Sequence, residues 1–180
     1  NIVVTTWEWH DPKKYLHDLI SSDRRYPTVN AYGPLYGSPE YSTDVYPILD
    51  PKTHTVTTFK APVRDADTPE AFGPGHAAIA KPMAPSPYWG EEKIWDTKAN
   101  NHNGMFDRQG RVWFAATVRA QKNPDFCQKG SDHPSAKLFP VAQANRHVTM
   151  LDPKTMKYTF VDNRFQTHHL QFGYDANDTL

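Results

Sequence analysis

The sequence contains little cysteine, no net charge and no long hydrophobic run. Cys127 is the only cysteine among 180 residues, which excludes a disulfide within the chain and a metal site built from several cysteines. Lys and Arg together number 20, as do Asp and Glu, so no net field attracts nucleic acid or an anionic membrane. We therefore predict no nucleic-acid partner and no membrane span in this stretch.

Several catalytic signatures are also missing from the sequence. There is no glycine-rich phosphate loop, no nucleophile elbow and no His-Glu-x-x-His helix, and no charged niche marks Cys127 as a nucleophile. Asp65 and Asp67 alternate in a short run that could hold a hard cation, but without a glycine-containing loop they are a weak signal. The only glutamates are Glu8, Glu40, Glu70, Glu91 and Glu92.

The residues that are present favour short strands. Sixteen prolines, nine glycines, nine tyrosines and five tryptophans suit strands joined by irregular loops, because proline cannot donate within a sheet and aromatic residues pack well on a pleated surface. One short helix is predicted near residues 11–22, with Asp11 as its cap and Pro12 at its first position. Its apolar stripe would consist of Tyr15, Leu16, Leu19 and Ile20. Otherwise we predict an all-β fold.

Three motifs recur along the chain in the same order. Leu49-Asp50-Pro51-Lys52-Thr53 returns as Leu151-Asp152-Pro153-Lys154-Thr155, each time between strand-like runs, so each copy predicts a hairpin with an Asp-Pro turn. The segment 1–6 is similar to 111–116. The segment 102–106 is similar to 168–172, and both copies lead into a turn that contains aspartate.

In chain order, these motifs define a unit of four antiparallel strands, which is the blade of a β-propeller when repeated around an axis. The predicted strands lie at about 103–107, 111–119, 147–151 and 156–162, and the next unit begins at 169–174. Within a single domain, residues 1–60 would supply strands 2 to 4 of one blade, residues 102–162 a complete blade and residues 168–180 the start of another. The alternative is a two-sheet β-sandwich in which the Asp-Pro motif recurs by chance.

Long loop insertions are expected on one face of the propeller. Residues 10–44, 61–101 and 120–146 join strands whose directions bring all three connections out at the same end. Loops on a rigid scaffold commonly carry binding or catalytic residues, although they also serve as packing lids or subunit contacts. Tyrosines and tryptophans gather in residues 26–46 and 82–95, where they would line a ligand cleft or pack the loops together.

Two histidines hold equivalent positions in successive units. His102 and His168 each stand at the start of the innermost strand, beside the central channel on the loop-bearing face, and His169 follows directly. Imidazole suits proton transfer near neutral pH and binds zinc, copper or iron. We predict His102 and His168 as catalytic residues, and both together with His169 as metal ligands; the alternative is that they cap the channel by hydrogen bonding. His133 is a weaker candidate.

The run at 102–114, His-Asn-Gly-Met-Phe-Asp-Arg-Gln-Gly-Arg-Val-Trp-Phe, followed later by the Asp-Pro motif at 151–155, resembles the blade repeat of streptogramin lyase (virginiamycin B lyase)-like propellers. The resemblance implies a closed propeller of seven blades, about two of them visible here, in an exported bacterial protein of the periplasm or extracellular space. It also implies opening of a cyclic ester by elimination, with a histidine base and a bound magnesium ion. The chain departs from that family in its long insertions and in lacking glutamates beside the inner-strand histidines.

Two functions follow from these observations. The first is a metal-assisted lyase or hydrolase that cleaves an ester or lactone at the channel face through the three histidines. The second is a non-catalytic binding or assembly propeller whose tyrosine- and tryptophan-rich loops contact a protein or carbohydrate. In either case we expect the stretch to belong to a longer chain or an assembly, because an unclosed propeller leaves sheet edges uncovered. Any targeting signal would then lie upstream of Asn1.

Overall fold

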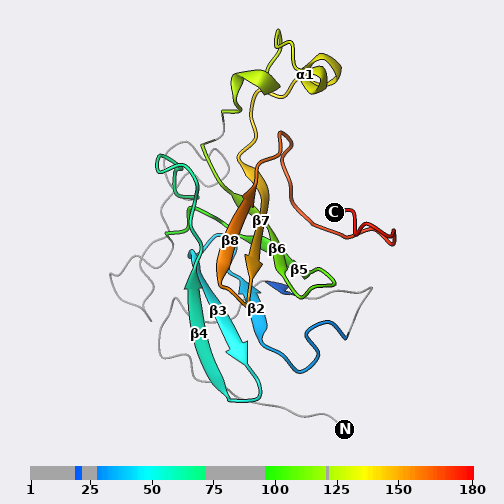
Figure 1. Cartoon of the computed structure of the whole chain (residues 1–180). Coiled ribbons are helices and arrows are strands. Elements are labelled where there is room, and N and C mark those ends of the chain that lie inside the picture. Colours follow the sequence, from blue (N-terminus) through cyan, green and yellow to red (C-terminus); the bar gives the residue numbers. More distant parts are fainter. Residues whose placement is uncertain (1–18, 22–27, 72–95, 121) are drawn as a thin grey trace.

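The computed structural model describes residues 19–21, 28–71, 96–120 and 122–180, which form two antiparallel sheets (Figure 1). The first sheet has the strand order β1–β2–β3–β4 and the second the order β5–β6–β7–β8. The all-β prediction is confirmed. The elements are β1 (Leu19–Ile20), β2 (Leu35–Ser38), β3 (Val45–Asp50), β4 (Thr55–Lys60), β5 (His102–Phe106), β6 (Val112–Thr117), the 3₁₀ helix η1 (Asp125–Cys127), α1 (Pro134–Leu138), β7 (Arg146–Asp152) and β8 (Lys157–Val161).

The two Asp-Pro motifs form equivalent hairpin turns, one between β3 and β4 and the other between β7 and β8. In each turn the aspartate side chain accepts a hydrogen bond from the backbone N–H two residues further on, at 2.8 Å for Asp50 and 2.9 Å for Asp152. His54 and Met156 occupy matching left-handed positions, with φ of 55° and 56°. The predicted equivalence of these hairpins is confirmed.

A second pair of turns also matches. Asp107 accepts hydrogen bonds from the backbone N–H groups two and four residues on, both at 2.9 Å, and Asp175 does the same at 2.9 and 3.2 Å. The strand predicted at 169–174 is nevertheless wrong, because this segment has no strand pairing. β5, by contrast, pairs with β6, the strand that follows its turn.

The first sheet differs from the prediction at its N-terminal edge. The strand expected in the segment 1–6 lies outside the described residues, as does most of the helix expected near residues 11–22. The C-terminal part of that predicted helix is wrong, because residues 19–20 form β1 and pair with Gly37 and Ser38. β2 in turn lies inside the segment predicted as a long loop and pairs with β3. A short apolar run fits a helix or a strand equally well, so backbone pairing decided the outcome here.

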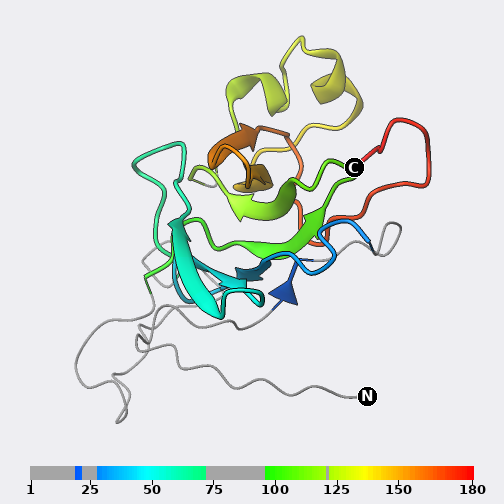
Figure 2. The same ribbon diagram turned by 60° about the horizontal axis from the view of Figure 1, so that its bottom comes forward.

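Aromatic side chains join the two sheets. Tyr46 of β3 stacks on Phe114 of β6 with 4.9 Å between ring centroids, and Phe59 of β4 stacks on Tyr158 of β8 at 5.5 Å. Figure 2 shows the first sheet lying against the second. Face-to-face packing of this kind occurs in sandwiches and also between neighbouring propeller blades. The described residues contain no closed ring of sheets.

The two sheets approach each other most closely at β5. The backbone N–H of Gly104 donates a hydrogen bond to Ser38 Oγ at 3.1 Å. A side chain at position 104 would collide with the Ser21 hydroxyl and press on the Phe114 ring. The strand pairing with β6 shifts in register just after His102. Glycine at 104 therefore permits the contact that holds His102 beside the first sheet.

The third long connection, residues 120–146, contains η1 and α1, which project together beyond the end of the second sheet (Figures 1 and 2). His133 caps α1, since its Nδ1 accepts a hydrogen bond from the backbone N–H of Ser135 at 3.3 Å. Cys127 is completely buried at the end of η1. Within the described residues, none of the helices has the length and apolar character needed to cross a membrane.

The two aspartate turns provide a matched test of fold stability. Asp107 is buried, and its carboxylate also accepts from Arg111 Nε at 2.6 Å and from Trp113 Nε1 at 2.8 Å. Asp107→Asn removes the acceptor of the partly buried Arg111 Nε and Trp113 Nε1 and should lower the free energy of unfolding by about 1–3 kcal/mol. Asp175 is exposed, so Asp175→Asn should cost less than about 0.5 kcal/mol. Urea unfolding measures both, and equal losses would contradict the packing described here.

Acid should destabilise the fold through His147, which is completely buried in β7. Burial lowers its pKa, although Asp162 lies 2.9 Å from Nδ1 and favours the charged form. The unfolded chain, with a histidine pKa of about 6.5, therefore binds a proton more readily than the folded chain. The free energy of unfolding should fall as the pH drops below about 6.5. His147→Gln should flatten this dependence in urea unfolding at pH 8 and pH 5, and an unchanged slope would count against it.

Candidate functional site

The structure brings the three predicted histidines together. Their potential ligand atoms all lie within 4.8 Å of one another. The ring centroids of His102 and His168 are 4.4 Å apart, those of His102 and His169 are 4.9 Å apart, and those of His168 and His169 are 4.3 Å apart. His102 is buried at the start of β5, whereas the other two side chains are exposed. In the part of the chain that the structure describes, no other group of three or more His, Cys, Asp or Glu side chains is close enough to hold a metal.

Two anchors hold His168 and His169 against the second sheet. On one side, Thr167 donates its backbone N–H to the Arg146 carbonyl at 2.9 Å and its hydroxyl to the His147 carbonyl at 2.6 Å. On the other side, the Asn103 amide donates to the carbonyl of Leu170 at 3.3 Å. The two histidines therefore lie on a short segment fixed at both ends beside β5 and β7.

Glu40 is a site residue that the sequence analysis did not identify. It lies between β2 and β3, and its Oε2 is 2.6 Å from Nδ1 of His102. Its Oε1 accepts a hydrogen bond from Nη2 of Arg146 at 2.6 Å, and the same nitrogen donates to the Asn100 carbonyl at 2.9 Å. The sequence analysis found no glutamate beside the inner-strand histidines, and the structure corrects this by placing Glu40 beside His102. No local sequence signal marks it, because it reaches His102 only through the packing of the two sheets.

The electrostatic surroundings favour the neutral form of His168 through its pKa. Partial desolvation lowers the pKa of His168, and positive charge on His102, His169 and Arg146 lowers it further, while Glu40 acts in the opposite direction. A neutral imidazole is the form that binds a metal or accepts a proton. His168 is therefore suited to either role near neutral pH.

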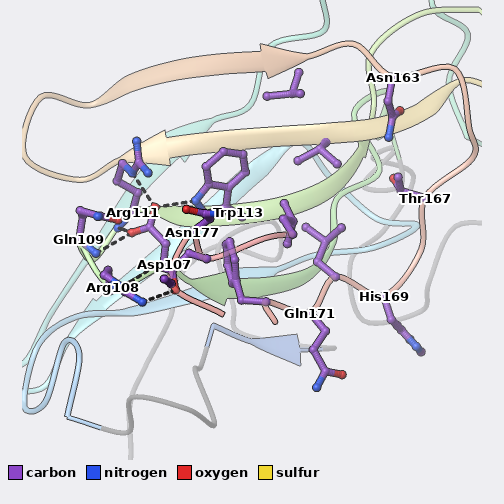
Figure 3. Close-up of a pocket in the computed structure, with 17 residues that line it drawn as sticks. Asp107, Arg108, Gln109, Arg111, Trp113, Asn163, Thr167, His169, Gln171 and Asn177 are labelled. Carbon is purple, nitrogen blue, oxygen red and sulfur yellow. Dashed lines mark hydrogen bonds and ion pairs between the residues drawn. The ribbon is translucent and has the colours of Figure 1, made fainter. Parts of the chain in front are cut away.

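A groove with a volume of about 760 Å³ runs between the second sheet and the C-terminal segment (Figure 3). His169 lines one end, and Arg108, which forms an ion pair with Asp178 at 2.7 Å, lines the other. Between them, Trp113 and Phe172 meet edge to face with 6.1 Å between ring centroids. A groove of this size is in the range of small-molecule sites, and it adjoins the histidine cluster.

The weaker candidates lie apart from this cluster or are already engaged. His133 caps α1 in the projecting connection. The Asp65 carboxylate accepts a hydrogen bond from Nε of Arg64 at 2.9 Å, and this contact lowers its pKa. The short run that contains Asp65 and Asp67 is thus partly neutralised by its own arginine and is a poor cation site.

Comparison with known proteins found no matching family model, no matching curated protein and no matching solved structure. The assignment of a function therefore depends on the geometry described above.

Proposed function

We propose that His102, His168 and His169 bind a divalent transition-metal ion and that the protein is a metal-assisted lyase or hydrolase acting on an ester or lactone. The single observation that carries the proposal is the convergence of three imidazoles from two separate segments, with ligand atoms within 4.8 Å. His102 lies on a strand, and His168 and His169 lie on a segment that is hydrogen-bonded at both ends.

The donor set favours particular metals. Magnesium, which the resemblance to streptogramin lyases implies, prefers oxygen ligands and does not fit three nitrogen donors. Zinc, copper and iron accept imidazole, and three histidines with a remaining open position are a common arrangement in catalytic zinc sites. The buried His102 would serve as the inner ligand, and the exposed His168 and His169 would complete the site from the solvent side.

A metal at this position would polarise an ester carbonyl or lower the pKa of a bound water. For elimination, His102 and His169 alone would hold the metal, and His168 would instead accept the proton from the carbon next to the C–O bond. That bond breaks with its electron pair leaving on the carboxylate, and a C=C bond forms. For hydrolysis, all three histidines would act as ligands and water would supply the nucleophile. The groove beside His169 offers room for the remainder of the substrate.

We also propose that the two sheets are neighbouring blades of a propeller. The recurrence of both turn types in the same order supports this, since Asp50 and Asp152 form one pair of turns and Asp107 and Asp175 the other. Export to the periplasm or extracellular space remains a prediction from the family resemblance.

A binding role is the second candidate function. Tyr32 lies between β1 and β2 and is 85% exposed, and Tyr41 lies between β2 and β3 and is 41% exposed. Both belong to the tyrosine-rich segment 26–46. Exposed aromatic side chains are common in contacts with partner proteins. A binding propeller would use this surface and would not require the histidines to hold a metal.

Metal content tests the proposed site directly. Purified protein equilibrated with zinc and then desalted should retain one ion per chain, as measured by elemental analysis. His102→Ala and His169→Ala should lose the ion, because these two histidines are ligands in both of the proposed reactions. His54→Asn serves as the control, since it replaces an exposed histidine at a left-handed position that asparagine tolerates. Retention of zinc by both alanine variants would exclude the site.

The product distinguishes the two reactions. A β-acyloxy amide incubated with the zinc-loaded protein in H₂¹⁸O should give an unsaturated amide and unlabelled acid by elimination, or an alcohol and ¹⁸O-labelled acid by hydrolysis. If His168 is the base, His168→Ala should keep the zinc but stop the elimination, since no group then accepts the proton. If it is a ligand, zinc and activity should be lost together. No turnover of any ester or lactone by the zinc-loaded protein would contradict the enzymatic proposal.

A further inference from the structure

We infer that Glu40 is a positioning residue that orients His102 and fixes which of its nitrogens faces a metal. This inference rests on the proposed metal site. The carboxylate of Glu40 lies 2.6 Å from Nδ1 of His102. A carboxylate at that nitrogen favours the tautomer with hydrogen on Nδ1, so the lone pair is on Nε2. Carboxylate–histidine–metal triads use this arrangement to hold the ring and raise its basicity.

The burial of Glu40 and His102 supports a positioning role for Glu40. The side chains of Glu40, His102 and Arg146 are all less than 10% exposed. A buried carboxylate is costly unless each oxygen is compensated. Here Arg146 binds Oε1 at 2.6 Å and His102 approaches Oε2 at 2.6 Å. Arg146 thus compensates one oxygen, and the other lies beside the imidazole.

Glu40 is supplied by the first sheet, whereas the three ligands belong to the second sheet and the segment after it. Its own backbone is held locally, because its N–H donates to the Ser38 carbonyl at 2.8 Å. The N–H of the next residue, Tyr41, donates to Oδ1 of Asn100 at 2.7 Å. Metal affinity should therefore depend on how the first sheet docks against the second, even when every ligand is intact.

Glu40→Gln tests the inference with two metal probes, zinc and cobalt. The carboxylate presents one oxygen to Arg146 and the other 2.6 Å from His102 Nδ1, whereas an amide has a single acceptor oxygen. Competition titration with a chromophoric chelator should therefore show zinc affinity weakened about 10–100-fold. The visible spectrum of the cobalt-substituted protein should also change, because the ring of His102 is no longer fixed. Glu40→Asp, which keeps the charge on a shorter chain, should recover part of the affinity. Glu70→Gln is the control and should leave affinity and spectrum unchanged.

Arg146→Gln separates positioning from simple loss of stability. Arg146→Gln breaks the same buried ion pair but leaves the Glu40 carboxylate beside His102. Zinc affinity should therefore stay within about threefold of that of the unmodified protein. This should hold even if thermal stability falls as much as in Glu40→Gln. Equal weakening of zinc binding in both variants would overturn the inference and assign Glu40 a structural role. If Glu40→Gln bound zinc as tightly as the unmodified protein, the inference would also be overturned, but the proposed metal site would not be affected. Absence of zinc from the unmodified protein would instead remove the proposed function.

Discussion

The stacking of Tyr46 on Phe114 determines where the rest of the molecule lies. Both rings are fully buried, and the Tyr46 hydroxyl has no hydrogen-bond partner within the described residues. Burial raises the pKa of this hydroxyl well above its usual value, and taking a hydroxyl out of water is costly. Aromatic contact and removal of apolar surface from water offset that cost. With the sheets held in this way, the connection after β2 reaches the second sheet and Glu40 meets His102.

The histidine site depends on this docking and on two further constraints. β5 carries His102 at its start, and Thr167 and Leu170 fix the segment that contains the other two histidines. A site whose parts are held by packing and hydrogen bonds loses little freedom when a ligand binds. Its exposed side adjoins the groove, so a substrate could approach without disturbing the core. Rigid anchoring and open access are the two properties that a catalytic centre needs together.

Local signals predicted the parts of the structure that local chemistry determines. Asp-Pro turns and aspartate turns form from a few neighbouring residues, so their recurrence in the sequence predicted matching hairpins. The meeting of His102 with His168 and His169 was predicted from their matching places in the repeated motif, although the second copy of that motif forms no strand. Three features could not be predicted: β2 within a supposed loop, the unpaired segment at 169–174, and Glu40 beside His102. Each depends on which distant segment lies alongside, and spacing in the sequence does not contain that information.

Gly104 has a consequence for how sequences of this fold can diverge. The space that a β-carbon would need there is occupied by Ser21 and Phe114, and the backbone N–H is bound by Ser38. A relative with alanine at this position would have to shrink the residues opposite it or widen the gap between the sheets. Widening would draw the carboxylate away from the imidazole. Substitutions at positions 21, 38 and 104 should therefore be correlated among related sequences. Related chains that lack glycine at 104 should also lack an acidic residue at 40.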